Sequence, residues 1–528
     1  MSGSILVAMA SVEFADDRPT LEVANRGLLT VGVLMAMIVY MLDATIANVA
    51  LPHMQASLGA TFDTITWVLT SYIIALAVAT PITGWLSDCI GSRNLFLIAV
   101  AGFVLASMAC GASTNLEEMV LFRFIQGVMG AFIGPLSQTA MLDINPPSRQ
   151  ARSMSLWGMG IMIAPIMGPI IGGWLTESYN WRWVFYVNLP VGMIAFALLW
   201  LFLPSRPISR RSFDLFGFAV LAIALSSLQL MLDRGTDQDW FESVEIWIEA
   251  IIAVSAFWVF SVHLFTKHNT IIDAALLKNS NMAMALVFQL IIGLMMMAVM
   301  ALMPPMLQRV YGYDVLDTGM LLAPRGIGIL MAMFIASRLI NRVDPRYIIM
   351  TGLTIASVSM WQMTQWSLVM DSTPIVVSGI VQGLGMGLCF MPVNSMAFST
   401  LDTQYRTEGA SILNLFRSLG GSVGISIVTA VLGMNVQTSH ADLSSHITSS
   451  SMSAVDPATA DRFGVFGETA MAMVNAEVNR QALMIAYLDD FKLIMYILFF
   501  ALPVILMMRP PKTVSFSSPQ GTADSIGH

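Results

Sequence analysis

The feature that most constrains this chain is a series of apolar runs, each roughly twenty residues long, that recurs along its length. About twenty apolar residues in an α-helix cross the hydrocarbon of a bilayer, and a helix satisfies its own backbone hydrogen bonds there. The fourteen predicted spans lie at residues 28–51, 64–86, 94–112, 119–142, 151–173, 183–203, 214–231, 246–265, 282–304, 318–340, 347–366, 374–398, 411–434 and 491–508. The chain is therefore expected to be an all-α membrane protein.

The composition agrees with this prediction and excludes other classes of protein. Hydrophobic residues make up 56% of the 528 residues and charged residues only 11%, whereas soluble domains carry about 25% charged residues. Disordered chains need low hydrophobicity and high charge, and nucleic-acid binding needs a basic face, but the net charge is -8. The three cysteines are far apart, and no metal-site or phosphate-loop motif occurs. We therefore expect no metal and no organic cofactor.

The distribution of Lys and Arg predicts how the spans are oriented. With the N-terminus in the cytoplasm, sixteen of the 25 basic residues fall in cytoplasmic segments and only six in external segments, as the positive-inside rule requires. An even number of spans places both termini on the same side. The stretch before Arg26 has no apolar run long enough for a signal peptide. We predict a multi-pass membrane protein with both termini in the cytoplasm.

A faint internal repeat divides the chain into two halves. Pro52 matches Pro304 at an offset of 252 residues, and Arg149 matches Arg406 at an offset of 257. Halves in the same orientation are the arrangement of the major facilitator fold, here two parallel six-helix bundles plus two inserted transmembrane helices. The predicted parts are a cytoplasmic N-terminal tail (1–26), a first bundle (27–204), the inserted pair (205–279), a second bundle (280–510) with a long external loop (435–490), and a cytoplasmic C-terminal tail (511–528).

The 435–490 loop is rich in Ser, Thr, Ala and Asp. A loop of this length is typical either of a functional segment or of a solvated, disordered linker. A short helix is expected at its end, over residues 480–491.

One acidic residue, Asp43, lies deep within the first predicted span. A carboxylate in hydrocarbon is costly unless it is paired, hydrated or protonated. At about 1.5 Å per residue, Asp43 and Arg123 lie at roughly comparable depths below the outer ends of their helices. We hypothesise that the two side chains approach each other and that Asp43 exchanges a proton as its environment alternates between wet and dry. The alternative is an ion pair that only fixes helix packing.

Three segments resemble motifs of known transporters. Residues 84–93 resemble the gating-loop signature of the major facilitator superfamily, with Cys89 and Ser92 where the family usually has cations. Residues 164–173 resemble the antiporter motif of its drug exporters, and residues 123–127 resemble its proton-coupling motif. On these motifs together, nearly the whole chain resembles the fourteen-span drug:proton antiporters of the EmrB/QacA type.

This resemblance implies proton coupling at Asp43 and Arg123, with the proton gradient in place of any cofactor. It also implies a cytoplasmic gating loop and a bending interface between the halves. The gating-loop residues are Gly84, Asp88, Gly91 and Arg93, and the antiporter-motif residues are Pro165, Gly168, Pro169, Gly172 and Gly173. The expected partners are the lipid bilayer, amphipathic drugs, a periplasmic adaptor of EmrA type and an outer-membrane channel of TolC type.

Polar, aromatic and methionine side chains inside the spans are candidates for a substrate cavity. Thioethers adapt to varied shapes, although most of the 42 methionines are expected to face lipid or the core. The candidates are Asn48, Gln126, Gln138, Trp157, Met159, Met162, Arg325, Met386, Met391, Asn394, Asn414 and Arg417. Because Arg417 lies near the inner end of its span, it is also a candidate for snorkelling to the headgroups.

These observations favour export of amphipathic, toxic compounds across a bacterial inner membrane, in exchange for protons and by alternating access. Two alternatives stay open, a proton-coupled importer of a small nutrient and a membrane scaffold that transports nothing, because a fold does not dictate function. Residues 420–424 match the Gly-x-Ser-x-Gly pattern of hydrolases. Inside a span this pattern indicates a close helix contact, so we predict no catalytic residues.

Overall fold

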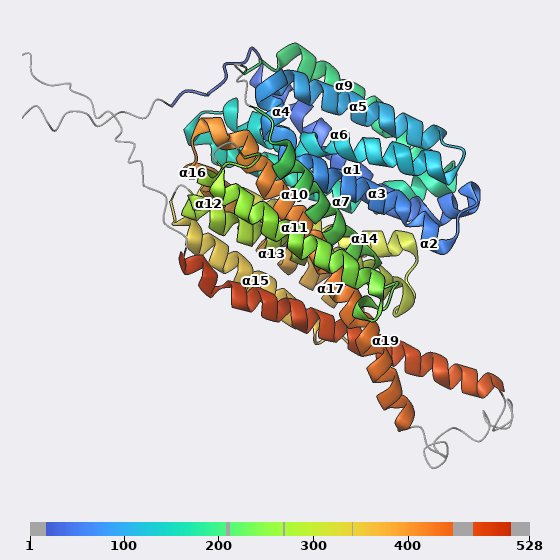
Figure 1. Cartoon of the computed structure of the whole chain (residues 1–528). Coiled ribbons are helices and arrows are strands. Elements are labelled where there is room, and N and C mark those ends of the chain that lie inside the picture. The colour runs from blue at the N-terminus through green and yellow to red at the C-terminus, as the bar shows by residue number, and fades with distance from the viewer. Residues whose placement is uncertain are drawn as a thin grey trace, which may run out of the picture.

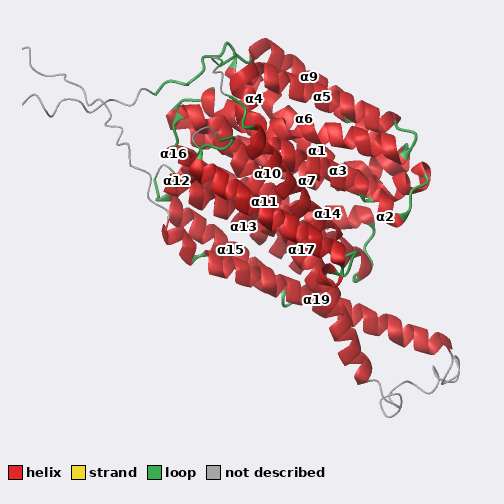
Figure 2. Cartoon of the chain, viewed as in Figure 1, coloured by secondary structure: helices red, strands yellow, loops and turns green. Residues whose placement is uncertain are grey.

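Helices form every regular element that the structure describes. In this computed structural model the described residues are 17–206, 208, 212–267, 270–340, 342–446 and 468–507. No strand occurs among them (Figure 2), so the prediction of an all-α chain is confirmed there. Most of the two predicted tails and the middle of the predicted 435–490 loop lie outside the described residues.

The first six predicted spans form one bundle. Its elements are α1 (Arg26–Leu58), α2 (Phe62–Ile65), α3 (Trp67–Ala79), η1 (Thr80–Ile82), α4 (Thr83–Ile90), α5 (Ser92–Ala112), α6 (Leu116–Asp143), α7 (Pro147–Ser178), α8 (Trp183–Tyr186) and α9 (Asn188–Phe202). α1 packs against α7 and α9, and α3 packs against α6. The second span changes to a 3-10 turn at Pro81, because proline cannot donate the backbone hydrogen bond that continues an α-helix.

The last six predicted spans form a second bundle. Its elements are α12 (Ala274–Lys278), α13 (Ser280–Arg309), α14 (Val315–Leu339), α15 (Pro345–Met363), α16 (Thr373–Ser399), η3 (Thr403–Tyr405), α17 (Arg406–Ser445), α19 (Glu468–Ala501) and η5 (Pro503–Met507). Glycines bring α13 and α17 close together, since a Cβ on Gly420 would lie 2.0 Å from the carbonyl oxygen of Leu290. The hydrolase-like pattern at residues 420–424 therefore belongs to a helix contact, as predicted.

The inserted pair consists of α10 (Leu215–Arg234) and α11 (Val244–Thr266), joined through η2 (Trp240–Glu242). α10 packs against both α3 and α17, so the pair lies across the seam between the two bundles (Figure 1). The hydroxyl of Ser426 donates a 2.6 Å hydrogen bond to the carbonyl oxygen of Leu232. On the other side of the seam, the hydroxyl of Thr70 bonds to the carboxylate of Asp233.

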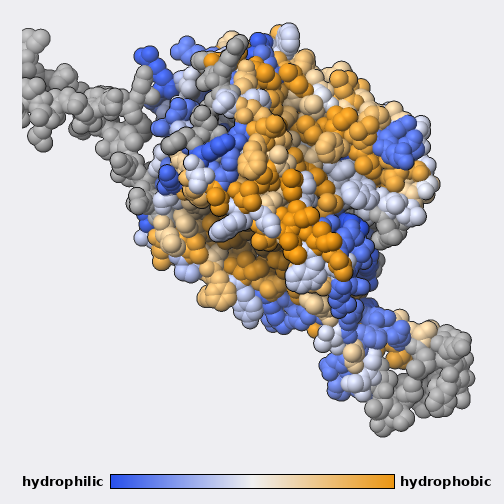
Figure 3. Space-filling view, viewed as in Figure 1, coloured by the Kyte–Doolittle hydropathy of each residue, from blue (hydrophilic) through white to orange (hydrophobic). Residues whose placement is uncertain are grey.

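Thirteen described helical segments are long and apolar enough to cross a membrane. The predicted span at 347–366 corresponds to α15, a 19-residue helix that is not among the thirteen but packs against α16 and α19. The count of fourteen spans therefore stays a prediction. Apolar side chains cover much of the visible flank of the body, and hydrophilic side chains gather toward its ends (Figure 3).

The segment expected to be a long loop is helical in its described parts. α17 continues to Ser445, and α19 begins at Glu468 rather than near residue 480. The two helices project together from the body on the side opposite the beginning of α1 (Figure 1). Strong helix formers such as Ala, Met and Glu fill the first turns of α19, and this propensity outweighs the polar composition from which we expected a loop.

Candidate functional site

The carboxylate of Asp43 is completely buried and accepts hydrogen bonds from three side chains. The first is Arg123 on α6, whose Nη1 lies 2.7 Å from Asp43 Oδ2. The other two donate to Asp43 Oδ1, Gln126 Nε2 at 2.9 Å and Asn188 Nδ2 at 2.7 Å. We call these four residues the Asp43 cluster. The two charged groups predicted to lie at similar depths are thus in contact, while their part in proton coupling stays a prediction.

Hydrogen bonds and a cation–π contact with several neighbours fix the position of the Arg123 guanidinium. Its Nε donates to the carbonyl oxygen of Val68 at 3.1 Å, and its Nη1 also donates to Gln126 Oε1 at 2.9 Å. Its guanidinium lies over the ring of Tyr72, 4.2 Å from the centroid. Only 1% of the Arg123 surface is exposed. A buried ion pair with all of these hydrogen bonds is stable only while both partners stay charged.

Two members of the Asp43 cluster differ from the sequence predictions. Gln126 was expected in the substrate cavity, but its amide is buried between Asp43 and Arg123. The reason is that Gln126 lies one helical turn after Arg123, on the same face of α6. Asn188 was not among the candidates at all. Its only signal in the sequence is an amide at the first residue of an apolar helix, which α9 turns inward.

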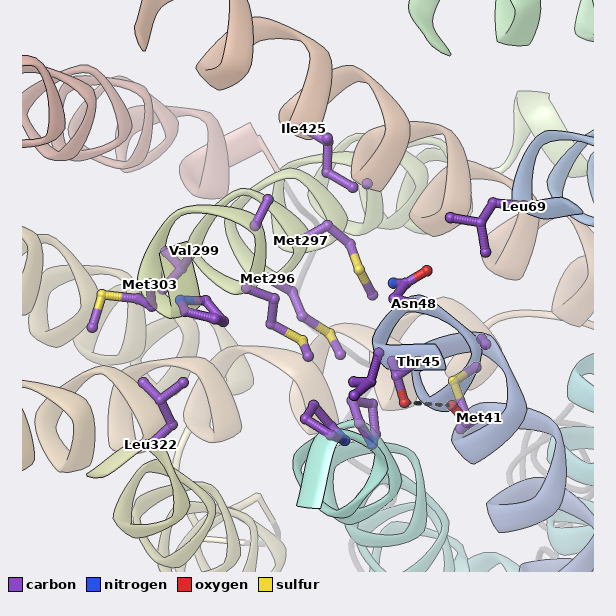
Figure 4. A pocket seen from close by; sticks show the side chains of 18 of the residues that line it. Met41, Thr45, Asn48, Leu69, Met296, Met297, Val299, Met303, Leu322 and Ile425 are labelled. Atoms are coloured by element: carbon purple, nitrogen blue, oxygen red, sulfur yellow. Dashed lines mark hydrogen bonds between the residues drawn. The ribbon is translucent and has the colours of Figure 1, made fainter. Parts of the chain in front are cut away.

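A cavity of about 810 Å³ lies beside the Asp43 cluster, between the two bundles. Arg123 and Tyr72 line it, whereas Asp43 is behind them. Most of the remaining lining is apolar and rich in methionine. Met296 and Met297 point from α13 across the cavity toward Thr45 and Asn48 on α1 (Figure 4). Such a lining suits varied apolar shapes more than one fixed ligand.

The cavity reaches the face of the molecule opposite the beginning of α1. Its lining there includes Pro52, His53, Glu177 and Gln308, which are exposed and lie within the last turns of their helices. We call this the open face, and the face where α1 begins the terminal face.

At the terminal face the two bundles are joined. Asp143 at the end of α6 forms ion pairs with Arg206 and with Arg406, and Arg406 Nη1 lies 3.1 Å from Asp143 Oδ1. The backbone N–H of Leu21 donates to the carbonyl oxygen of Asp143 at 3.0 Å. Because Arg406 begins α17 of the second bundle, these contacts close the seam between the bundles on this side.

The predicted gating loop takes part in this closure. Gly84 packs on Glu408, since a Cβ on Gly84 would lie 3.1 Å from the Cβ of Glu408. Gly91 links α4 to α5 with a φ of 88°, a conformation that favours glycine. Asp88 lies on α4 between these two glycines. Arg93 instead donates to the carbonyl oxygen of Trp200 at 2.6 Å, within its own bundle.

Between the cavity and the terminal face, four amide side chains form a network across the seam. Gln138 Nε2 and Gln289 Nε2 both donate to Asn394 Oδ1, at 2.9 and 3.0 Å. Asn414 Nδ2 donates to Gln138 Oε1 at 3.0 Å. We call Gln138, Gln289, Asn394 and Asn414 the amide network. It forms a polar floor that connects α6 with α16 and α17 below the cavity.

Five of the twelve predicted cavity residues line the cavity, and seven do not. Those that line it are Asn48, Met162, Arg325, Met386 and Arg417. The seven that lie outside its lining in this structure are Gln126, Gln138, Trp157, Met159, Met391, Asn394 and Asn414. They pack between helices: Trp157, for example, donates to the hydroxyl of Ser137 at 2.8 Å and stacks on Phe390.

Arg417 also differs from the expected alternative of snorkelling to the headgroups. Only 8% of its surface is exposed. Its Nη2 donates to Asn414 Oδ1 at 2.6 Å, and it lines the cavity rather than the outer surface of the bundle. The guanidinium is drawn inward because the amide network offers it an acceptor there.

The antiporter motif brings α7 very close to α1. A Cβ on Gly168 would lie 2.2 Å from Thr45 Oγ1, and one on Gly172 would lie 2.7 Å from Ile46 Cγ1. The other three residues of the motif, Pro165, Pro169 and Gly173, line the cavity. α7 also packs against α14 of the second bundle. The motif therefore connects the wall of the cavity to the helix that carries Asp43.

Comparison with known proteins agrees with the fold. The sequence profile of the Major Facilitator Superfamily matches residues 33–425. The chain is 32% identical to the multidrug export protein EmrB of Escherichia coli K12, over 93% of this chain and 97% of that protein. It is 33% identical to EmrB of Haemophilus influenzae, over 80% of this chain and 83% of that protein. The fold is similar to the crystal structure of human MFSD10, with a TM-score of 0.55 and 14% identity, over 89% of this chain and 98% of that one.

Proposed function

The chain belongs to the Major Facilitator Superfamily, and on this premise we propose that it exports amphipathic, toxic compounds in exchange for protons. It is a multidrug efflux transporter of the inner membrane rather than an enzyme, since its relatives over most of its length are multidrug export proteins. No cofactor beyond the proton gradient enters the proposal.

The observation that carries proton coupling is the buried Asp43 beside the cavity. Ionised Asp43 accepts three hydrogen bonds and balances Arg123. Protonation removes the charge that Arg123 needs, so the guanidinium gains by turning toward the cavity or toward water. The two protonation states therefore favour different arrangements of α1 and α6, and coupling requires such a difference.

In this proposal the terminal face is cytoplasmic, as the distribution of basic residues predicts. The structure then has its cavity open to the outside and closed toward the cytoplasm by the amide network and by Asp143. This is the state that releases a drug and accepts a proton. Return to the cytoplasm requires the contacts of Asp143 and of the amide network to break.

The projecting ends of α17 and α19 lie on the external side in this orientation (Figure 1). We propose that they contact a periplasmic adaptor of EmrA type, which passes the drug to an outer-membrane channel of TolC type. Two helices that leave the body of a transporter offer a surface that the bilayer does not cover.

The experiment that tests proton coupling uses Asp43→Asn in proteoliposomes with an imposed pH gradient. We expect export of a fluorescent drug to fall by more than about tenfold, because the side chain can no longer change its charge. Asp402→Asn is the matched control, since Asp402 is an exposed acid on the terminal face, and its export should equal that of the wild type. Unchanged pH-driven export by Asp43→Asn would remove Asp43 from the mechanism.

A further inference from the structure

The charges that line the cavity are unevenly balanced. The charged lining residues are Arg123, Glu177, Arg325 and Arg417, with His53 at the rim. Asp43 neutralises Arg123, and Glu177 is exposed at the open face. In the part of the chain that the structure describes, neither Arg325 nor Arg417 forms an ion pair. The inner part of the cavity therefore has two positive charges without a counterion.

Both arginines are buried, so the lack of a counterion is energetically costly. Arg325 is 9% exposed and Arg417 is 8% exposed. The Nη2 of Arg325 reaches only the sulfur of Met386, at 3.7 Å, and its Nε has no hydrogen-bond partner. A cation within a membrane protein is costly unless it is paired or serves a ligand or ion path. A guanidinium in a cavity is well suited to hold a carboxylate through two parallel hydrogen bonds.

The backbone positions of both arginines are fixed by glycine contacts with a neighbouring helix. A Cβ on Gly383 of α16 would lie 2.2 Å from the carbonyl oxygen of Arg325. A Cβ on Gly293 of α13 would lie 2.0 Å from the carbonyl oxygen of Arg417. Neither helix turn can move away from the cavity without separating these pairs. The charges are thus presented from rigid elements, as a binding site requires.

The rest of the lining suits the apolar part of a ligand. Met296, Met297, Met303 and Leu322 line the same cavity as the arginines, and the first three project into it from α13 (Figure 4). The cavity volume of about 810 Å³ is within the range of typical ligand pockets. A molecule with an acidic head and an apolar body would satisfy both regions at once.

We propose that Arg325 and Arg417 form a subsite for the acidic head group of anionic amphipathic substrates. This inference rests on the proposed export function and names the substrate class that the cavity favours. An amphipathic cation of the same size fits the apolar lining equally well, but it meets two buried positive charges instead of a partner.

The test measures equilibrium binding of radiolabelled dodecanoate and of dodecyltrimethylammonium to the purified protein in lipid nanodiscs, with empty nanodiscs subtracted. No proton gradient is applied, so a failure of proton coupling does not affect the result. We expect dodecanoate to bind more tightly than the cation. Arg325→Gln and Arg417→Gln should each weaken dodecanoate binding by about tenfold, while cation binding stays the same or tightens.

Controls separate charge recognition from loss of folding. Arg309→Gln removes an equal charge from an exposed position at the end of α13, outside the cavity lining, and should leave both affinities unchanged. Arg325→Lys keeps the charge without the planar fork and should recover part of the dodecanoate affinity. Equal affinity of the wild type for the two probes, or dodecanoate binding that survives both Gln substitutions, would overturn the proposal.

Discussion

The buried cations of the two bundles differ in whether an acidic side chain pairs with them. In the first bundle, Arg123 is matched by Asp43 and by a full set of hydrogen bonds. In the second bundle, Arg325 and Arg417 face the cavity with no acidic partner among the described residues. The difference separates two tasks. A matched pair can respond to a proton, and an unmatched charge can respond to a ligand.

The largest expected effect comes from removing Arg123, the matched cation of the first bundle, and it is compared with removal of Arg325, an unmatched cation of the second bundle. Arg123→Leu leaves the Asp43 carboxylate buried without its counterion and should lower the free energy of unfolding by about 3–5 kcal/mol. Arg325→Leu removes a charge that has no partner, so it should cost far less or even stabilise the protein. Chemical unfolding of the purified variants in detergent measures both. Similar losses for the two variants would contradict the contrast between the bundles.

A smaller effect is expected from disturbing the Asp43 cluster without changing any charge. Gly168→Ala places a methyl group 2.2 Å from Thr45 Oγ1, so α7 must shift against α1. The expected cost is about 1–3 kcal/mol, together with reduced pH-driven export. Gly433→Ala is the matched control, because a Cβ there meets nothing within 4 Å. Equal export by the two variants would show that the cluster does not depend on this contact.

The smallest effect on stability is expected for Asp17, an exposed carboxylate outside the two bundles' buried ion pairs. The backbone N–H and the hydroxyl of Ser148 bond to Asp17 at 3.0 and 2.7 Å, and they hold the pKa of Asp17 below its ordinary value. A lowered pKa in the folded state stabilises the protein above the ordinary carboxyl range, and this contribution is lost as the pH falls through the lowered value.

The difference in melting temperature between wild type and Asp17→Asn should therefore be small near neutral pH, and it should vanish once the pH falls below the lowered pKa of Asp17. Thermal unfolding across this range measures it. In the background of Ser148→Ala the difference should shrink at every pH. A difference that grows on acidification would have the wrong sign for this hydrogen-bonded carboxylate.

Sequence patterns predicted the properties that depend on depth in the membrane. Runs of apolar residues predicted where helices lie, and counting residues along them placed Asp43 and Arg123 at similar heights. Depth needs only the rise of a helix, which is constant. The structure brings these two side chains together at 2.7 Å.

The rest of the site depends on how each helix is rotated about its axis, and sequence alone did not determine this. Gln138 and Asn394 are at a suitable depth for the cavity, yet they bond to each other across the seam. Asn188 was overlooked for the same reason, because only packing of α9 against α1 turns it toward Asp43. Rotation follows from glycine contacts such as Gly168 on Thr45, and these become visible only when both helices are in place.

The inserted α10–α11 pair bonds to α17 through Ser426 and to α3 through Asp233. Because the pair is bonded to both bundles, it cannot keep both contacts unchanged if the bundles tilt away from each other. In the proposed transport cycle, one attachment would have to break, or the pair would have to tilt by an intermediate amount. These two attachments would therefore resist tilting of the bundles away from each other during that cycle.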